Sequence, residues 1–173
     1  NRRFQSPPPL ALAAGSSWSN LVMPEKGTLY VAQSDIKDYF YSLALPEQLQ
    51  PLFCLPPIPC HLVEAWNVDP KLRFGSGVNG QLWPRLRVVP MGWSWAMYLS
   101  QRIHQNLVLE STGLDPSRLL IDGVPPPFLE GGEVAIIPYA DNLNVAGLDQ
   151  DRVQHVKDTV VAKLRATGFR VQD

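Results

Sequence analysis

Two aspartates, Asp35 and Asp141, are the residues of this chain whose placement could support metal chemistry. Asp35 ends an apolar run that begins near Thr28, and Asp141 lies at the tip of an apolar hairpin in VAIIPYADNLNVAG. Two carboxylates at strand ends of one small sheet can meet at its edge and hold two Mg2+ ions, which prefer oxygen ligands. Such an ion pair suits in-line phosphoryl transfer, because it stabilises both the attacking and the leaving oxygen.

A purely structural role is the alternative for each aspartate. Asp is common as a helix-capping residue and as a turn residue. Asp35 could therefore cap the helix that follows it, and Asp141 could simply turn the hairpin. Local pattern alone favours these structural roles, so the surrounding motifs have to decide.

Length and composition suit one domain without a membrane span. The 173 residues are 45% hydrophobic, which is enough for a core, and no apolar run reaches the ~18 residues of a membrane helix. Two cysteines, Cys54 and Cys60, predict neither a disulfide framework nor a structural zinc site, and they favour an intracellular location, nuclear or cytoplasmic. A net charge of -1 gives no electrostatic footprint for nucleic acid and counts against a polymer-binding function.

The elements that must position the two acids are strands and helices in alternation. Strands are predicted from Thr28 to about Asp35, around Phe53 and in QLWPRLRVV, with a short helix starting near Pro46. The stretch from His61 to Gly80 is expected to be an irregular surface excursion. Together with the hairpin, this order predicts an α+β domain with helices packed on one face of an antiparallel sheet.

Two longer helices are predicted from apolar residues at helical spacing. The residues that form these two stripes are Ala96, Leu99, Ile103 and Leu107 in the first helix and Val153, Val156, Val160 and Leu164 in the second. Gly168 is placed to end the second helix, and the FRV that follows is expected to begin a strand.

Four stretches resemble the motifs of reverse transcriptases. SDIKDYFYSLAL resembles motif A, VVPMGWSWAMYLSQ resembles motif B, YADN resembles the motif C box of Tyr, any residue, Asp, Asp, and LRATGFRV is similar to motif D. They occur in the family's order from about Leu29 to Val171, and four motifs in register are far more specific than one. The variants resemble retroelement polymerases related to the LTR class.

The resemblance implies a polymerase palm-like sheet and a division of the chain. Residues 1–27 would be a partial fingers segment, with NRRF as the tail of a fingers strand. Residues 28–173 would be a palm-like domain that carries motifs A to D, and a thumb would be absent.

The resemblance also implies a role for individual residues. Asp35 and Asp141 would be catalytic carboxylates that bind two Mg2+ or Mn2+ ions, and Ile36 would offer its backbone carbonyl to the second ion. The nucleotide pocket would be lined by Asp38, Tyr39, Phe40, Pro90, Met91, Gly92 and Tyr139. Phe40 falls at the position that screens the sugar 2′ carbon and so favours deoxynucleotides; a core position for at least one ring of YFY is the alternative.

Asn142 departs from the family's pattern, which has a second Asp at this position. An amide oxygen can still ligate Mg2+, but losing a unit charge a few Å from a dication should cost on the order of several kcal/mol. Some viral RNA polymerases carry a Gly-Asp-Asn box at this turn and are active. Asn142 is therefore kept as a catalytic candidate, either as a tolerated variant or as a mark of decay.

Three hypotheses follow. The first is a fingers and palm part of a retroelement's RNA-directed DNA polymerase, with an RNA or DNA template-primer and dNTPs as partners. The second is a catalytically degenerate polymerase fold that binds nucleic acid or protein, which Asn142 and the near-neutral charge support. The third is an unrelated α+β interaction domain with accidental motif matches. The distance between Asp35 and Asp141 separates the first two hypotheses from the third. If their carboxylates lie far apart in the fold, a shared metal site is ruled out.

Overall fold

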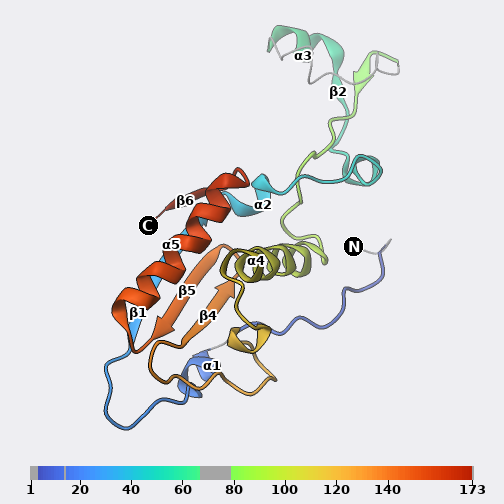
Figure 1. Cartoon of the computed structure of the whole chain (residues 1–173). Coiled ribbons are helices and arrows are strands. Elements are labelled where there is room, and N and C mark those ends of the chain that lie inside the picture. The colour runs from blue at the N-terminus through green and yellow to red at the C-terminus, as the bar shows by residue number, and fades with distance from the viewer. Residues whose placement is uncertain (1–3, 14, 67–78, 173) are drawn as a thin grey trace.

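A four-stranded antiparallel sheet forms the centre of the molecule (Figure 1). The computed structural model describes residues 4–13, 15–66 and 79–172. The strands are β1 (Tyr30–Lys37), β4 (Val134–Tyr139), β5 (Asn142–Gly147) and β6 (Arg170–Gln172), in the order β4-β5-β1-β6. Every neighbouring pair of this sheet is antiparallel. The predicted fold class is therefore confirmed.

Two 17-residue helices, α4 (Ala96–Thr112) and α5 (Gln150–Ala166), pack on one face of this sheet (Figure 1). The larger of two hydrophobic cores fills the space between these helices and the strands. Its most deeply buried members include Ile36, Val108, Ile136, Leu143, Val145, Val160 and Leu164. Each fully buried aliphatic side chain of this kind contributes roughly 1.5–3 kcal/mol. The predicted packing of the helices on one face is confirmed.

Local signals fix both ends of α5. The Asp149 side chain accepts a hydrogen bond from the backbone of Arg152 at 3.0 Å and so caps the first turn. Gly168 adopts a φ of 97°, and the amides of Gly168 and Phe169 donate to the carbonyls of Arg165 and Leu164 at the helix end. This pair of bonds is a Schellman motif, which confirms the predicted stop at Gly168.

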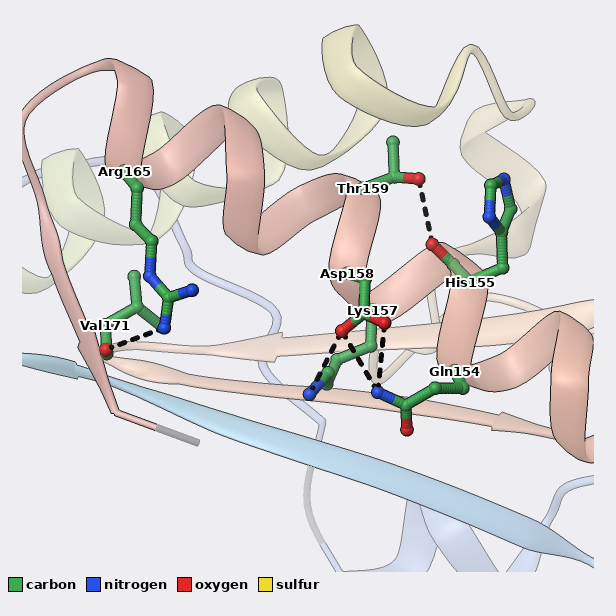
Figure 2. A network of polar contacts seen from close by, with 7 residues as sticks. All are labelled: Gln154, His155, Lys157, Asp158, Thr159, Arg165 and Val171. Carbon is green, nitrogen blue, oxygen red and sulfur yellow. Dashed lines mark hydrogen bonds and ion pairs between the residues drawn. The ribbon is translucent and has the colours of Figure 1, made fainter.

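α5 carries a polar network that joins two exposed side chains, Gln154 and Asp158, to the buried Lys157 (Figure 2). Gln154 donates from Nε2 to both carboxylate oxygens of Asp158 at 3.0 and 3.1 Å, and Lys157 lies 3.2 Å from the same carboxylate. At the penultimate residue of the helix, Arg165 donates to the carbonyl of Val171 at 3.2 Å and so ties α5 to β6. Because Lys157 is buried and Asp158 is exposed, this ion pair joins the buried and the exposed side of the helix.

The opposite face of the sheet is partly covered by the N-terminal segment. A second core there consists of Ala13, Leu120, Leu129, Ala135, Ile137 and Ala146, with Trp18, Leu21 and Met23 packed against it. The short helix α1 (Gly15–Ser19) belongs to this segment. Because the second core joins Ala13, Trp18, Leu21 and Met23 to β4 and β5, β4 is buried on both faces. The division at residue 27 stays a prediction.

The segment between α2 (Tyr39–Ser42) and α4 is where the predicted elements are wrong. A 3-10 helix, η1 (Gln50–Phe53), replaces the strand around Phe53 and lies later than the short helix expected near Pro46. In QLWPRLRVV only Gln81–Leu82 forms a strand, β3, which pairs with β2 (Ile58–Pro59). The physical reason is proline, which has no N–H to donate to a ladder. Pairing with the 43–55 segment survives only as two isolated antiparallel bridges, Ala44 with Val88 and Cys54 with Arg85.

The rest of this segment extends away from the sheet (Figure 1). Cys60–Ala65 forms a helix, α3, within the stretch expected to be irregular, and residues 67–78 of that stretch lie outside the described residues. The predicted fingers strand at NRRF also lies outside them, except for Phe4, which is in a bend and stacks on Phe53 at 5.6 Å. After α4, a short 3-10 helix, η3 (Pro116–Arg118), leads toward β4. None of the described helices is both long and apolar enough to cross a membrane.

Candidate active site

Asp35 and Asp141 lie side by side at the margin of the central sheet. β1 and β5 pair in a register that sets Asp35 opposite Asn142, the residue directly after Asp141. One residue further along β1, the amide of Ile36 donates to the carbonyl of Asp141 at 2.8 Å. The two acids, 106 positions apart in the sequence, thus lie at the same end of adjacent strands. Since Asp35 lies within β1, the alternative that it caps a helix is wrong.

The sheet places Asp35 and Asn142 on the face opposite α4 and α5, called the open face below. Residues that pair directly across antiparallel strands point to the same face. Asn142 pairs with Asp35 on one side and with Tyr139 on the other, so these three share a face. Alternation along the strands adds Gln33, Lys37, Asn144, Arg170 and Gln172 to it. The pattern Asn-Leu-Asn in β5 was the sequence signal for Asn144, which sequence analysis missed.

The two carboxylates carry like charges and repel each other. Partial burial, together with the negative charge of Asp141, raises the pKa of Asp35 above its ordinary value. A dication bound between the two would relieve this repulsion, and the donor set of carboxylate oxygens matches Mg2+ or Mn2+. The pair therefore fits divalent metal. Among the described residues, no three or more His, Cys, Asp or Glu side chains gather in a metal-binding arrangement, so further ligands would have to be backbone, amide or substrate oxygens.

The backbone of Ile36 and the side chain of Asn142 supply such oxygens nearby. In a strand the N–H and C=O of one residue point to the same side, so the Ile36 carbonyl points, like its amide, toward the turn that holds Asp141. The side chain of Asn142 donates from Nδ2 to Oδ1 of Asp141 at 3.1 Å. This amide partly offsets the negative charge of Asp141, whereas an Asp at position 142 would add a second negative charge.

The turn that carries Asp141 is held from the helix side by α4. Ala140 has a φ of 50°, which is unusual for a residue with a side chain. Its amide donates to Gln101 Oε1 at 2.8 Å, and its carbonyl accepts from His104 Nδ1 at 2.8 Å. Gln101 also donates from Nε2 to the carbonyl of Pro138 at 2.6 Å. Sequence analysis assigned no role to Gln101 or His104.

The predicted nucleotide-pocket residues at the start of α2 differ in exposure. Asp38 is exposed and forms an ion pair with Arg170 at 2.6 Å. The Tyr39 side chain is buried and donates its hydroxyl to the carbonyl of Ser100 at 2.7 Å, and its burial raises the pKa of the phenol. Only the Tyr39 backbone can therefore line a pocket, and this ring is the core member of YFY. Phe40 is half-buried and packs at 6.1 Å from the Tyr39 ring.

The predicted nucleotide-pocket residues Pro90, Met91 and Gly92 lie in a tight turn before α4. The Trp93 amide donates to the carbonyl of Pro90 at 3.2 Å, and Gly92 within the turn has a φ of 87°, which favours glycine. Space around the α-carbon of Gly92 is open, and Met91 is 63% exposed. The tip of the turn thus presents backbone and a flexible side chain to solvent, with Trp93 buried beneath it.

Tyr139 lies at the open face beside a shallow depression. Its side chain is 41% exposed and lines a hollow of about 440 Å³ together with the segment 10–13, Gly15 and Asp122. The structure therefore brings Asp35, Ile36, Tyr139, Asp141 and Asn142 together at one margin. It places the Pro90–Trp93 turn at the start of α4 and Asp38 at the start of α2.

The sequence of the whole region matches one protein family. A family model described as "Reverse transcriptase (RNA-dependent DNA polymerase)" matches residues 4–173. The chain belongs to the reverse transcriptase family. A comparison with curated proteins gave no match. Family membership excludes the third hypothesis, that of accidental motif matches, and agrees with the palm-like sheet.

Membership of the reverse transcriptase family carries broad functional implications. The family acts as RNA-directed DNA polymerases, which bind a nucleic acid template-primer and dNTPs and generally use divalent metal ions. The margin that carries Asp35 and Asp141 is the part of this chain whose donor set fits such ions.

Proposed function

We propose that this chain provides the fingers and palm part of a retroelement polymerase and catalyses template-directed DNA synthesis. The primer 3′ oxygen would attack the α-phosphate of a dNTP, the new ester bond would form as the bond to pyrophosphate breaks, and the hydroxyl proton would leave to solvent. The observation that carries this proposal is the shared position of Asp35 and Asp141 at the end of β1 and the β4-β5 turn.

The proposed metal ligands are the carboxylates of Asp35 and Asp141 and the carbonyl of Ile36. Divalent ions bound there would stabilise charge on the attacking and leaving oxygens and on the phosphate between them. The raised pKa of Asp35 supports this role, because two like charges held together by the fold create a site that is complementary to a cation. Asn142 would contribute an amide oxygen without charge.

The open face is the proposed path of the primer end. Gln33 and Asn144, which pair with each other two residues from the margin, offer amides on this face that can donate to phosphate or base oxygens. Lys37 adds positive charge on the same face, whereas Arg170, its partner across β1 and β6, is ion-paired with Asp38. This local arrangement supports nucleic acid binding although the net charge of the chain is -1.

Phe40 is the proposed discriminator between dNTPs and ribonucleotides. Its ring packs against Tyr39, which the hydroxyl bond to Ser100 anchors, so Phe40 is backed by the core and cannot readily retreat from a 2′-hydroxyl.

Primer extension tests the proposal, with Mg2+ and with Mn2+ in parallel reactions. Asp141→Asn should lower incorporation by at least ~10³-fold, because the lost charge is worth several kcal/mol near a dication and 1.36 kcal/mol is tenfold in rate. Asn142→Asp should raise incorporation with Mg2+, since it adds a negative oxygen at the margin. Glu130→Gln removes an exposed carboxylate elsewhere and should change nothing.

Two outcomes contradict the proposal. If the wild-type chain incorporates no dNTP with either metal, the catalytically degenerate binding module becomes the better hypothesis. If incorporation persists in Asp141→Asn at the level of Glu130→Gln, the assignment of the site is wrong.

A further inference from the structure

Two fully buried polar side chains of α4 hold the turn that carries Asp141. Gln101 and His104 are both 0% exposed, and the backbone of the β4-β5 hairpin is bonded by both polar atoms of the Gln101 amide and by Nδ1 of His104. Gln101 bridges Pro138 and Ala140, and His104 bonds the other peptide group of Ala140. Ala140 therefore has both of its peptide groups fixed by one helix, directly before Asp141.

Such burial demands an explanation, because Gln and His are seldom completely buried and lose hydration there. Ala140 has a left-handed backbone conformation (φ 50°). A residue with a side chain keeps this conformation only where its surroundings enforce it, which also indicates that the turn is held in place. Hairpin turns at a sheet margin usually bond to water or within their own strands. Here the bonds run to a helix on the far face of the sheet, so the turn cannot shift without disturbing α4.

We propose that Gln101 and His104 are positioning residues that set where the Asp141 carboxylate stands and thereby set the affinity of the site for divalent metal. This inference rests on the proposed function, because it concerns the same pair of carboxylates. Neither residue would touch metal or nucleotide, and both act through Ala140.

The chemistry of His104 makes its part of the proposal specific. The carbonyl of Ala140 can only accept, so Nδ1 of His104 must carry the proton. Nε2 is then the unprotonated nitrogen, and it is buried without a hydrogen-bond partner among the described residues. Asn at this position would keep a donor near the place of Nδ1, whereas Leu would remove it.

Four variants of the whole chain separate positioning from general packing. Gln101→Met keeps length but removes both hydrogen bonds, and His104→Leu removes the donor to Ala140. His104→Asn tests rescue by a conserved donor. Ser100→Ala is the matched control, because Ser100 is equally buried on α4 but its hydroxyl bonds only to Met97 of the same helix.

Three measurements apply to each variant: hydrogen exchange of the Ala140 amide by NMR, the affinity for Mn2+ alone by electron paramagnetic resonance, and kcat and KM for dNTP in primer extension. Gln101→Met should speed exchange of the Ala140 amide by roughly 10- to 100-fold, as expected for an amide that loses its partner. Gln101→Met and His104→Leu should each weaken Mn2+ binding by about 10- to 100-fold, as supporting residues of metal sites do. In both variants kcat should fall while KM for dNTP stays within about threefold.

The controls decide whether the effect is positioning. His104→Asn should bind Mn2+ within about threefold of wild type, and Ser100→Ala should match wild type in all three measurements. The inference is overturned if Gln101→Met and His104→Leu bind Mn2+ like Ser100→Ala, if His104→Asn fails as badly as His104→Leu, or if the wild-type chain binds no Mn2+. A chain that shows the expected Mn2+ pattern but extends no primer would refute the proposed function and leave the positioning role standing.

Discussion

Helices α4 and α5 have the same length and cover the same face of the sheet, yet they bury opposite kinds of side chain. The buried side of α5 is mostly apolar, and Val153, Val156, Val160 and Leu164 are the residues whose spacing predicted it. The most buried side of α4 carries Ser100, Gln101, His104 and Gln105 beside Val108. Leu99, Ile103 and Leu107, predicted as its core stripe, are only partly buried.

The buried side chains of the two helices act on the structure in different ways. Apolar contacts have no direction, so the buried side of α5 stabilises the fold without specifying the position of any one backbone group. Hydrogen bonds have direction, so the buried amide and imidazole of α4 fix particular peptide groups of the β4-β5 turn. Both helices contribute apolar side chains to the core, and α4 in addition bonds the peptide groups of the turn.

The largest effect is expected from truncating the apolar side of α5. Leu164→Ala removes a completely buried side chain and should lower the free energy of unfolding by about 2–5 kcal/mol in urea denaturation. Leu52→Ala, at a side chain that is 46% exposed, is the control and should cost less than about 1 kcal/mol. Equal losses in the two variants would contradict the assignment of stability to α5.

The tight packing of α5 against the sheet can be tested by substituting a glycine of β5. A Cβ at Gly147 would lie 2.9 Å from Val153 Cγ2 and 3.0 Å from the carbonyl oxygen of Glu133. Gly147→Ala should therefore cost about 1–3 kcal/mol of unfolding free energy. Gly132→Ala, where the same atom meets nothing within 4 Å, should leave stability nearly unchanged. Thermal denaturation measures the stability of both variants. If Gly147→Ala is as stable as Gly132→Ala, the packing around Gly147 is loose.

The two helices should also differ in how protonation affects stability. Burial lowers the pKa of His104 below its ordinary value of 6.5, so below that pH the unfolded chain takes up a proton that the folded chain does not. Stability should fall as the pH drops from 7 to 5.5, by up to about 1.4 kcal/mol per pH unit.

His104→Asn should flatten this part of the pH profile of the unfolding free energy. His155→Asn is the matched control on α5, where the ring is exposed, and it should keep the wild-type slope. An unchanged slope in His104→Asn would mean that another group causes the dependence.

The smallest effect is expected on the outer side of α5. Gln154→Ala removes both hydrogen bonds to Asp158 shown in Figure 2. Because these groups are exposed and water replaces the bonds, the free energy of unfolding should change by less than about 0.5 kcal/mol. A larger loss in calorimetry would show that the outer network contributes more than its exposure suggests.

Much of the site could be predicted because its signals are local or carried by motifs. Asp141 at the tip of a hairpin, the stripe of α5 and the stop at Gly168 each follow from a few neighbouring residues. The division of roles within YFY could not be predicted in this way, since only the packing of Tyr39 under Ser100 shows which ring is in the core. The strand predicted around Phe53 was wrong, because a 3-10 helix with a proline at its start takes its place.

The sequence by itself determined the fold class, the family motifs and the two acids, because apolar periodicity and turn residues act over a few positions. Only the tertiary structure decided that Gln101 and His104 face inward and hold the turn of Asp141. A polar side chain on a helix looks solvent-exposed in sequence, and its burial becomes favourable only when partners distant in the chain satisfy it. Those partners are Pro138 and Ala140, which the pairing of β4 with β5 and the packing of α4 bring within reach.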